Sequence, residues 1–413
     1  MTAEPKLTAR QLPSAVRREL DALPITDVHT HIYDPALGPV LLWGLDELLT
    51  YHYLVAEVFR CRPEMATGDF WALSKTAQAD LIWDELFVKR SPLSEACRGV
   101  LTALISIGLD PHVRTLAPLR RWFAKQNARD YVDLVFDKAN LRRVYMTNDP
   151  FDPAEAPGWA QPFARDPRFL GVLRLDSALM NWPEPAARLA GAGFRVEEAL
   201  SGQTIAELRR YLNVWCDRFE ARYMAISLPP SFRYPAVQSP LTNLLVKAVL
   251  PVAEARGIPL AMMIGVRKLV NPALRLAGDS LGVSDVETVE QLARDFPKNR
   301  FLITMLAREN MHGLCIAARK FANILPFGCW WFLNNPSLID EITRMRLELL
   351  GLSFVPQHSD ARVLDQLLYK WSHSRAIIAG VLSEKYAGLL DAGWAVTRSE
   401  IRRDLGLLLD VAP

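Results

Sequence analysis

The feature of this sequence that most restricts its fold is a regular alternation of short β-branched or apolar runs with longer helical stretches. One run lies near the N-terminus, at 25–31, and seven follow after residue 141: Arg143–Thr147, Phe169–Leu175, Tyr223–Leu228, Pro259–Gly265, Arg300–Leu306, Asn323–Gly328 and Ser353–His358. Helical patterns separate most of them, at Val196–Cys216, Leu241–Arg256, Ser284–Asp295, Met311–Lys320 and Leu338–Leu350. Runs that are continuously apolar, without strict alternation, are typical of parallel strands buried on both faces.

Eight strands that alternate with helices predict an α/β fold, and in particular a (β/α)8 barrel, or TIM barrel. An open doubly wound sheet has a similar alternation, but no Gly-x-Gly-x-x-Gly motif follows any of the runs. The 413 residues are compatible with a single barrel domain, 1–413, because such barrels often carry insertions. The stretch 33–141 has helical patterns and no strong strand. We therefore expect a large helical insertion after strand one, as a cap or accessory subdomain.

The composition is that of a globular chain with mixed charges. The 48 basic and 46 acidic residues give a net charge of +2, which leaves no electrostatic footprint for nucleic acid. No run of 18 apolar residues and no signal-peptide pattern occurs, so we expect no membrane segment and no secretion. The five cysteines are scattered and contain no CxxC, which argues against a disulfide framework or a cysteine zinc site. The sequence therefore favours a cytoplasmic protein.

Two histidines stand out in the first predicted strand. His29 and His31 are two residues apart, and alternate side chains of a strand share one face. Two imidazoles at a strand end form half of a metal site. Asp360 directly follows the eighth run, and closing a barrel places the last strand beside the first. We therefore predict a metal site of His29, His31 and Asp360, which suits a divalent ion such as Zn²⁺, with Mn²⁺ or Fe²⁺ as alternatives.

Further motifs lie at the ends of predicted strands or in the helical insertion. They are His52-Tyr53 preceded by Trp43, Met146-Thr147-Asn148-Asp149-Pro150, Arg174, Leu306-Ala307-Arg308-Glu309-Asn310, Phe327-Gly328-Cys329-Trp330-Trp331-Phe332-Leu333-Asn334 and Ser359-Asp360-Ala361-Arg362. As a set, in this order, they resemble the motifs of the uronate isomerases, sugar-acid aldose–ketose isomerases of the amidohydrolase superfamily. The resemblance runs from residue 25 to about 375. It implies a metal-assisted isomerisation of a hexuronate such as glucuronate or galacturonate.

The resemblance also implies roles for individual residues. Isomerisation moves a proton between C2 and C1 through an enediol, so it needs a base and a group that polarises the carbonyl. Asp360 is the expected metal ligand and proton carrier. Tyr53 and His52 are expected as acids or hydrogen-bond partners at the sugar, although a buried His-Tyr pair on an amphipathic helix would have the same pattern.

Three arginines at strand ends are expected to bind the substrate. Arg174, Arg308 and Arg362 would offer a uronate carboxylate the bidentate partner that lysine cannot provide. Pairing with nearby acids remains the alternative for each of them, and Arg362 could instead orient Asp360.

Three other side chains are expected around the sugar. Trp330 and Trp331 could form a wall against it, and because adjacent strand residues point to opposite sides, we expect only one of them at the site. Asp149 is expected to bind a hydroxyl or to stabilise a turn before Pro150.

One departure from the family pattern keeps other functions open. The family's His-Ile-Gly on strand five is Met263-Ile264-Gly265 here, and a thioether can neither shuttle a proton nor donate a hydrogen bond. The alternatives are a metal-dependent hydrolase of an ester, lactone or amide, and a non-catalytic sugar-acid binding protein. Met263 and the absence of a histidine on strand six and of a lysine near Leu228 weigh against hydrolysis. The expected partner is a small sugar acid, with a homo-oligomer as the possible assembly.

Overall fold

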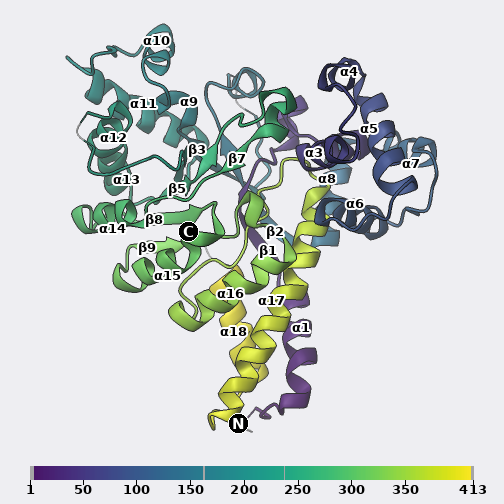
Figure 1. The fold of residues 1–413 in the computed structure, drawn as a ribbon. Coiled ribbons are helices and arrows are strands. Elements are labelled where there is room, and N and C mark those ends of the chain that lie inside the picture. Colours follow the sequence, from purple (N-terminus) through teal and green to yellow (C-terminus); the bar gives the residue numbers. More distant parts are fainter. Residues whose placement is uncertain (1–3, 161–162, 237, 411–413) are drawn as a thin grey trace.

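The computed structural model describes residues 4–160, 163–236 and 238–410, and a curled parallel sheet lies at its centre (Figure 1). The strand order is β1-β2-β3-β4-β5-β8-β9, and every neighbouring pair is parallel. The strands are Ile25–Thr30, Leu141–Asn148, Phe169–Arg174, Met224–Leu228, Leu260–Ile264, Phe301–Met305 and Ile324–Pro326. All residues of β1, β5 and β8 are buried, as expected for strands covered on both faces. The α/β class and the parallel sheet are therefore confirmed.

The eighth predicted strand is not regular in the part of the chain that the structure describes. One isolated bridge joins it to the end of β9, where Val355 N donates to Pro326 O at 2.9 Å and Gly328 N donates to Val355 O at 2.9 Å. On its other side, Asp360 N donates to the carbonyl of His29 at 3.1 Å. The segment 353–361 thus lies between β9 and β1 and bonds to both, without forming a ladder.

A layer of apolar side chains fills the inside of the curled sheet. All seven strands or their adjoining residues contribute to this layer, and so does the segment 353–361. The buried members are Val28, Tyr145, Val172, Tyr223, Ala225, Ala261, Leu302, Phe327 and Val355. The layer is a packed core that supports the carboxyl ends of the strands from below.

Helices cover the outside of the sheet. Between the later strands lie α9 (Asp176–Leu179), α10 (Glu184–Gly191), α11 (Thr204–Phe219), α12 (Pro240–Leu244), α13 (Leu250–Arg256), α14 (Val286–Asp295), α15 (Met311–Lys320) and α16 (Pro336–Leu350). A π-helical turn, Leu245–Val249, joins α12 to α13. Their starts follow ordinary capping rules: Asn335, for example, accepts a hydrogen bond from Leu338 N at the start of α16. A short antiparallel pair, β6 (Val266–Arg267) and β7 (Ser280–Leu281), lies outside the main sheet.

The stretch between β1 and β2 is helical in its regular structure, apart from one isolated bridge between Leu42 and Val363. It contains α2 (Leu45–Leu49), α3 (His52–Cys61), α4 (Thr67–Ala72), α5 (Lys75–Trp83), a π-helix (Asp84–Val88), α6 (Glu95–Ser106), α7 (Ala117–Phe123) and α8 (Ala128–Ala139). Figure 1 shows most of these helices together on one side of the sheet. The loop between β6 and β7 reaches them, since the Trp71 indole donates to the Ala273 carbonyl at 2.8 Å and the Arg275 guanidinium lies 4.4 Å from the Trp71 ring centroid.

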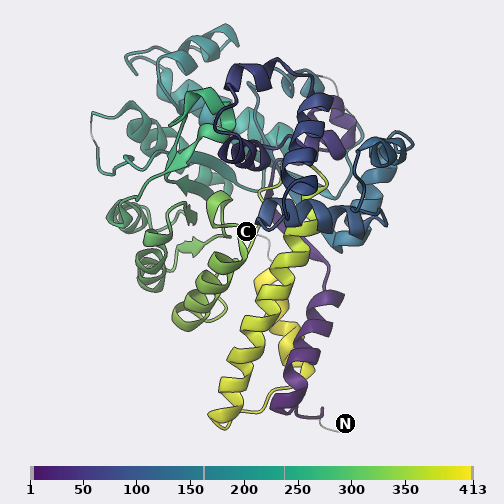
Figure 2. The same cartoon turned by 45° about the vertical axis from the view of Figure 1, so that its right-hand side comes forward.

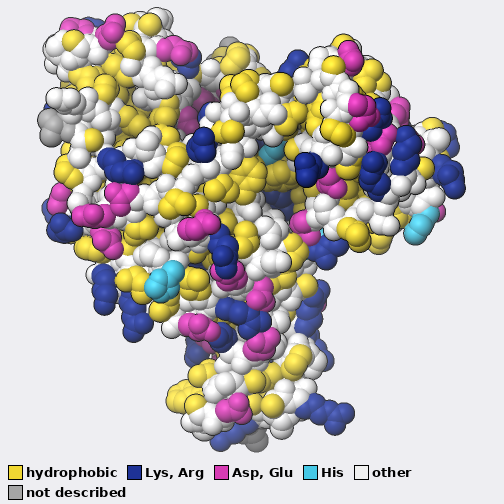
Figure 3. All heavy atoms as spheres, in the orientation of Figure 1, with side chains coloured by type: hydrophobic (Ala, Val, Ile, Leu, Met, Phe, Trp, Pro, Cys, Tyr) yellow, Lys and Arg dark blue, Asp and Glu magenta, His cyan; other side chains and the backbone are white. Residues whose placement is uncertain are grey.

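Three helices form a stalk that projects from the rest of the molecule (Figures 1 and 2). They are α1 (Leu12–Ala22), α17 (Gln366–Asp391) and α18 (Arg398–Leu409). Figure 3 shows basic and acidic side chains interspersed on this face of the stalk and of the body. None of the helices within the described ranges is long and apolar enough to cross a membrane.

Candidate active site

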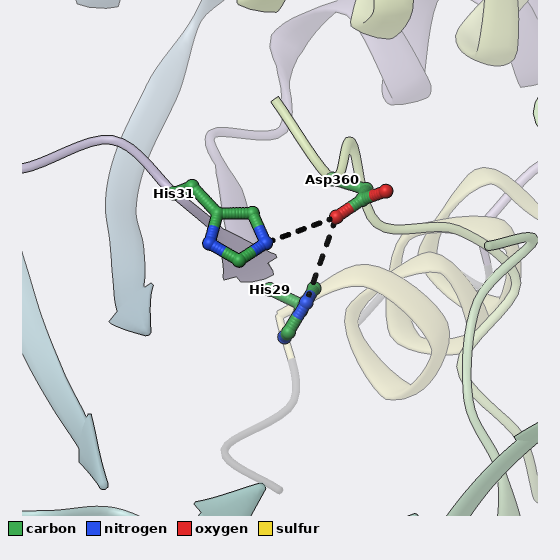
Figure 4. A group of neighbouring side chains, drawn as sticks. All are labelled: His29, His31 and Asp360. Carbon is green, nitrogen blue, oxygen red and sulfur yellow. Dashed lines mark ion pairs between the residues drawn. The ribbon is translucent and has the colours of Figure 1, made fainter. Parts of the chain in front are cut away.

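His29, His31 and Asp360 come together at the carboxyl end of β1 (Figure 4). His29 Nε2 lies 3.7 Å from Asp360 Oδ1, and His31 Nε2 lies 3.5 Å from the same oxygen. His29 is 1% exposed and Asp360 is 6% exposed. The three donor atoms lie within 4.8 Å of one another.

This donor set fits a small divalent cation. Metal–ligand bonds of 2.0–2.2 Å in a tetrahedral arrangement place ligand atoms about 3.3 Å apart, close to the distances from Asp360 Oδ1 to the two imidazoles. Burial lowers the pKa of His29 to about 3 and that of His31 well below its ordinary value. Both rings are therefore neutral near pH 7, as metal ligation requires.

Asp360 has a left-handed backbone, with φ of +50°, which is uncommon for a residue with a side chain. Bonds to the preceding residue hold this conformation in place. Ser359 N donates to Asp27 Oδ1 at 3.1 Å, and the Ser359 carbonyl accepts from Lys370 Nζ at 2.6 Å and from Asn334 Nδ2 at 3.0 Å. Side chains from β1, α17 and the segment after β9 thus fix the position of the Asp360 backbone.

Two of these side chains are buried charges. Burial raises the pKa of Asp27 to about 6, although Ser359 N and the Trp371 indole, at 2.8 Å, donate to its carboxylate. Burial lowers the pKa of Lys370 to about 8. Because Lys370 and Trp371 belong to α17, the start of the stalk helix is part of the site's support.

A cavity of about 30 Å³ adjoins the donor set and shares lining residues with two larger cavities. Its lining includes Tyr51, His52, Thr147, Arg174, Asp176, Ser227, Met263, Val266, Lys268, Leu276, Trp330, Trp331 and Arg362. A neighbouring cavity of about 420 Å³ shares Arg174, Asp176, Ser227, Val266 and Lys268 with it. A third, of about 460 Å³, lies towards the helices between β1 and β2 and shares Tyr51, His52, Leu276 and Arg362. Together they form a depression with both polar and apolar lining at the carboxyl ends of the strands, where α/β proteins bind ligands.

Of the two predicted polar residues of α3, only His52 lies at this depression, and Tyr53 is not among the residues that line any of the three cavities. His52 lines the cavity, and burial lowers its pKa to about 3. The ring of Tyr53 packs in the apolar cluster beside Trp330 and Trp331. Its hydroxyl is buried and has no hydrogen-bond partner among the described residues.

The predicted arginines divide into two groups. Arg174 and Arg362 line the cavity, and Asp176, 3.1 Å from Arg174, raises the pKa of that guanidinium. Arg308 is not among the residues lining any of the three cavities. Its side chain is 59% exposed and pairs with Glu341 at 2.9 Å. Its substrate-binding role stays a prediction that this placement does not favour.

Trp330 and Trp331 both line the cavity, so the expectation that only one would do so was wrong. The chain does not continue as a strand there, because a 3-10 helix begins at Trp331, whose φ is +47°. Strand alternation therefore does not apply. Asp149 lines the 420 Å³ cavity, where it accepts bonds from Phe151 N at 2.9 Å and from the Ser177 hydroxyl.

Three residues that line the cavity or lie behind it were not predicted as site residues from the sequence. Tyr51 directly precedes the His-Tyr motif, and this adjacency was the available signal. Lys268 comes from the β6–β7 loop, pairs with Asp279 at 2.7 Å and lies 5.4 Å from the Trp331 ring centroid. His358, which the sequence analysis leaves without a role, is fully buried, 5.1 Å from the His29 ring centroid, and has no partner for either nitrogen within the described chain.

The fold and the site define an α/β enzyme with its active site at the carboxyl ends of parallel strands. Comparison with solved structures identifies the family. A uronate isomerase from Bacillus halodurans C-125 matches with a TM-score of 0.95 and 51% identity, over 98% of this chain and 95% of that one. The chain therefore belongs to the uronate isomerase family, as the sequence motifs predict.

Two more distant structures share the fold. A uronate isomerase from Thermotoga maritima matches with a TM-score of 0.68, over 98% of this chain and 96% of that one. A glucuronate isomerase from Caulobacter crescentus matches with a TM-score of 0.69, over 98% and 93%. Both are 14% identical to this chain. A scan of protein-family models and a search of curated protein sequences gave no match.

Proposed function

We propose that this chain is a metal-dependent aldose–ketose isomerase of the amidohydrolase superfamily that acts on a hexuronate of the glucuronate or galacturonate type. The observation that carries the proposal is the buried cavity at which His29, His31 and Asp360 meet Arg174 and Arg362. The 51% identity to a uronate isomerase supports it. The donor set suits Zn²⁺ first, with Mn²⁺ or Fe²⁺ as alternatives.

The proposed architecture is one (β/α)8 barrel domain, 1–413, in which the segment 353–361 is the eighth strand. Its hydrogen bonds to the end of β9 and to β1 support this closure. The helical insertion, 33–141, is proposed as a cap, since Tyr51 and His52 from it line the cavity. The proposed location is the cytoplasm, and the proposed assembly is a homo-oligomer.

A divalent ion held by His29, His31 and Asp360 would polarise the substrate oxygens near C1 and C2. Asp360 directs Oδ1 to both imidazoles, and we assign its carboxylate the transfer of the proton between C2 and C1. We also assign the Tyr53 hydroxyl, which is buried beside the cavity-lining Trp330 and Trp331, a hydrogen bond to a substrate oxygen. His52 is neutral near pH 7 because of its lowered pKa, so it acts as a hydrogen-bond partner rather than a cationic acid.

The charges of the cavity suit a monoanionic sugar acid. Arg174 is paired with Asp176 and Lys268 with Asp279, while Arg362 and a divalent ion at Asp360 would leave the cavity with an excess of positive charge. The 30 Å³ beside the donor set hold only a few water-sized groups, so a six-carbon acid extends into the 420 Å³ cavity. Arg174 lines both cavities and is proposed to bind the carboxylate.

The remaining predicted side chains complete the proposed site. Trp330 and Trp331 provide an apolar wall, and Asp149 in the larger cavity accepts a hydrogen bond from a sugar hydroxyl.

The test is proton NMR in D2O with a panel of hexuronates and Zn²⁺- or Mn²⁺-supplemented protein. We expect deuterium at C2 and ketose formation in the wild type, and neither in Asp360→Asn. Asp340→Asn is the matched control, because this carboxylate on α16 pairs with Arg344 at the surface. No exchange with any hexuronate, in folded and metal-loaded protein, would refute the proposed function.

A further inference from the structure

Tyr223 lies directly below the donor set, on the far side of the sheet interior from β1. It immediately precedes β4 and is fully buried in the apolar layer that fills the curled sheet. Its side chain does not line any of the three cavities. Its hydroxyl is the group that connects this layer to the candidate ligand His29.

The Tyr223 hydroxyl makes two hydrogen bonds to β1, and their directions are fixed by chemistry. The hydroxyl oxygen lies 2.7 Å from the Val28 carbonyl oxygen, which can only accept. The single hydroxyl proton is therefore used in that bond. The same oxygen lies 3.1 Å from His29 Nδ1, and with its proton committed it can only accept there. His29 must consequently carry its proton on Nδ1.

The position of this proton determines what His29 presents to the cavity. A neutral imidazole with a proton on Nδ1 has a free lone pair on Nε2. Nε2 is the atom that faces Asp360 Oδ1 at 3.7 Å. The opposite tautomer would place an N–H at the candidate metal position and leave two acceptors, Nδ1 and the hydroxyl oxygen, facing each other.

We propose that Tyr223 is a positioning residue that fixes the tautomer and ring orientation of His29, so that Nε2 is preset as a metal ligand. This inference rests on the proposed metal site. A partner that orients a ligating histidine typically contributes 10- to 100-fold to metal affinity. Tyr223 acts through His29 and does not touch the substrate.

The central variant is Tyr223→Phe, which keeps the ring and removes only the hydroxyl. Tyr145→Phe is the matched control, because Tyr145 lies in the same buried layer with its ring 5.8 Å from that of Tyr223. The Tyr145 hydroxyl has no hydrogen bond to His29 in the described structure. Zn²⁺ affinity is measured by competition with a chromogenic chelator, and unfolding of the metal-free proteins is measured in urea.

We expect Zn²⁺ to bind 10- to 100-fold more weakly to Tyr223→Phe and within twofold of wild type to Tyr145→Phe. Equal Zn²⁺ affinity in wild type and Tyr223→Phe would overturn the inference, while leaving the proposed isomerase function intact. Wild-type protein that binds none of Zn²⁺, Mn²⁺ and Fe²⁺ would refute the metal site itself and this inference with it.

A second measurement needs no substitution at Tyr223. In ¹⁵N-histidine-labelled, metal-free wild type, the His29 resonances, assigned by their absence in His29→Gln, report which ring nitrogen is protonated. We expect the proton on Nδ1. A proton on Nε2 would overturn the proposal, even if Tyr223→Phe failed to fold.

Discussion

Lys370 of α17 is 4% exposed and donates from Nζ to the Ser359 carbonyl at 2.6 Å, one residue before Asp360. Replacing it with methionine removes a buried charge and keeps a side chain of similar length. The Ser359 carbonyl is not left without a donor, because Asn334 Nδ2 also donates to it at 3.0 Å. The replacement therefore tests what the buried ammonium group contributes to stability and to the site.

The size of the effect on stability follows from the pKa. Burial lowers the pKa of Lys370 from 10.5 to about 8, and each pKa unit corresponds to about 1.4 kcal/mol. Holding the charged form in the folded protein at pH 7 thus costs about 3 kcal/mol. We expect Lys370→Met to raise the free energy of unfolding at pH 7 by up to this amount, less any loss of packing.

The dependence of the free energy of unfolding on pH tests this burial cost. Between pH 8 and 10.5 the unfolded chain keeps a proton on Lys370 that the folded chain has released, so wild-type stability rises across this window. Below pH 8 the full cost remains. The stability advantage of Lys370→Met should therefore be largest at pH 7 and disappear by about pH 10.5.

Although we expect Lys370→Met to be more stable than wild type, we expect its enzymatic activity to be lower. Without the Lys370 bond the backbone before Asp360 is held less firmly, and a displacement of about 1 Å at a reacting group costs about 100-fold in rate. We expect kcat for ketose formation to fall at least tenfold. The assays are urea unfolding at pH 7, 8, 9 and 10.5 and hexuronate turnover, with Lys298→Met, whose side chain is 79% exposed, as the control.

Two results would refute this reasoning. If Lys370→Met is destabilised at pH 7, or if its stability difference from wild type is the same at every pH, the burial cost has been assigned wrongly. If turnover is unchanged, the Lys370 bond does not position Asp360.

Three further replacements test other parts of the structure. Arg174→Lys should raise KM for a hexuronate at least tenfold, because a bidentate partner is lost. In Arg308→Lys, where the arginine is exposed, KM should stay within twofold of wild type. Equal effects on KM would contradict the placement of the two arginines. Burial raises the pKa of Glu155 from 4.5 to about 7, so between these pH values the folded chain holds a proton that the unfolded chain releases. Urea titrations should therefore show about 3 kcal/mol of stability lost as pH rises through this window. Glu155→Gln should flatten this dependence of stability on pH. Gly328→Ala should cost about 2–5 kcal/mol, since φ is +68° and the added methyl overlaps an imidazole ring, whereas Gly257→Ala, left-handed with φ of +64° and with open space, should cost only about 1–2 kcal/mol.

The strands could be predicted because they follow the local sequence pattern. The donor set could be predicted because closing the expected barrel brings the last strand beside the first. Apolar or β-branched runs marked six strands of the sheet within a few residues, and β1 was marked by Ile25 and Val28 around its polar residues. His29 and His31 share a strand face by spacing alone, and the neighbouring position of Asp360 followed from the expected order of the strands. These inferences needed no knowledge of side-chain packing.

Other features could not be predicted from the sequence because they depend on tertiary contacts. Arg308 lies at a strand end, but that position does not decide whether its side chain turns to the cavity or to Glu341. Helix α17 is buried around much of its circumference, so it lacks a clear polar face, and it was not predicted. Lys370, which holds the backbone before Asp360, remained without a role for that reason.

The separation of the donor set in the chain has a consequence for biosynthesis. Asp360 follows His31 by 329 positions, and translation proceeds at about 5–20 residues per second, so the two imidazoles leave the ribosome roughly 20–60 s before the carboxylate. During that interval the nascent polypeptide offers only two of its three ligands. An ion that requires all three can be captured only late in synthesis, and metal loading would then distinguish finished polypeptides from incomplete ones.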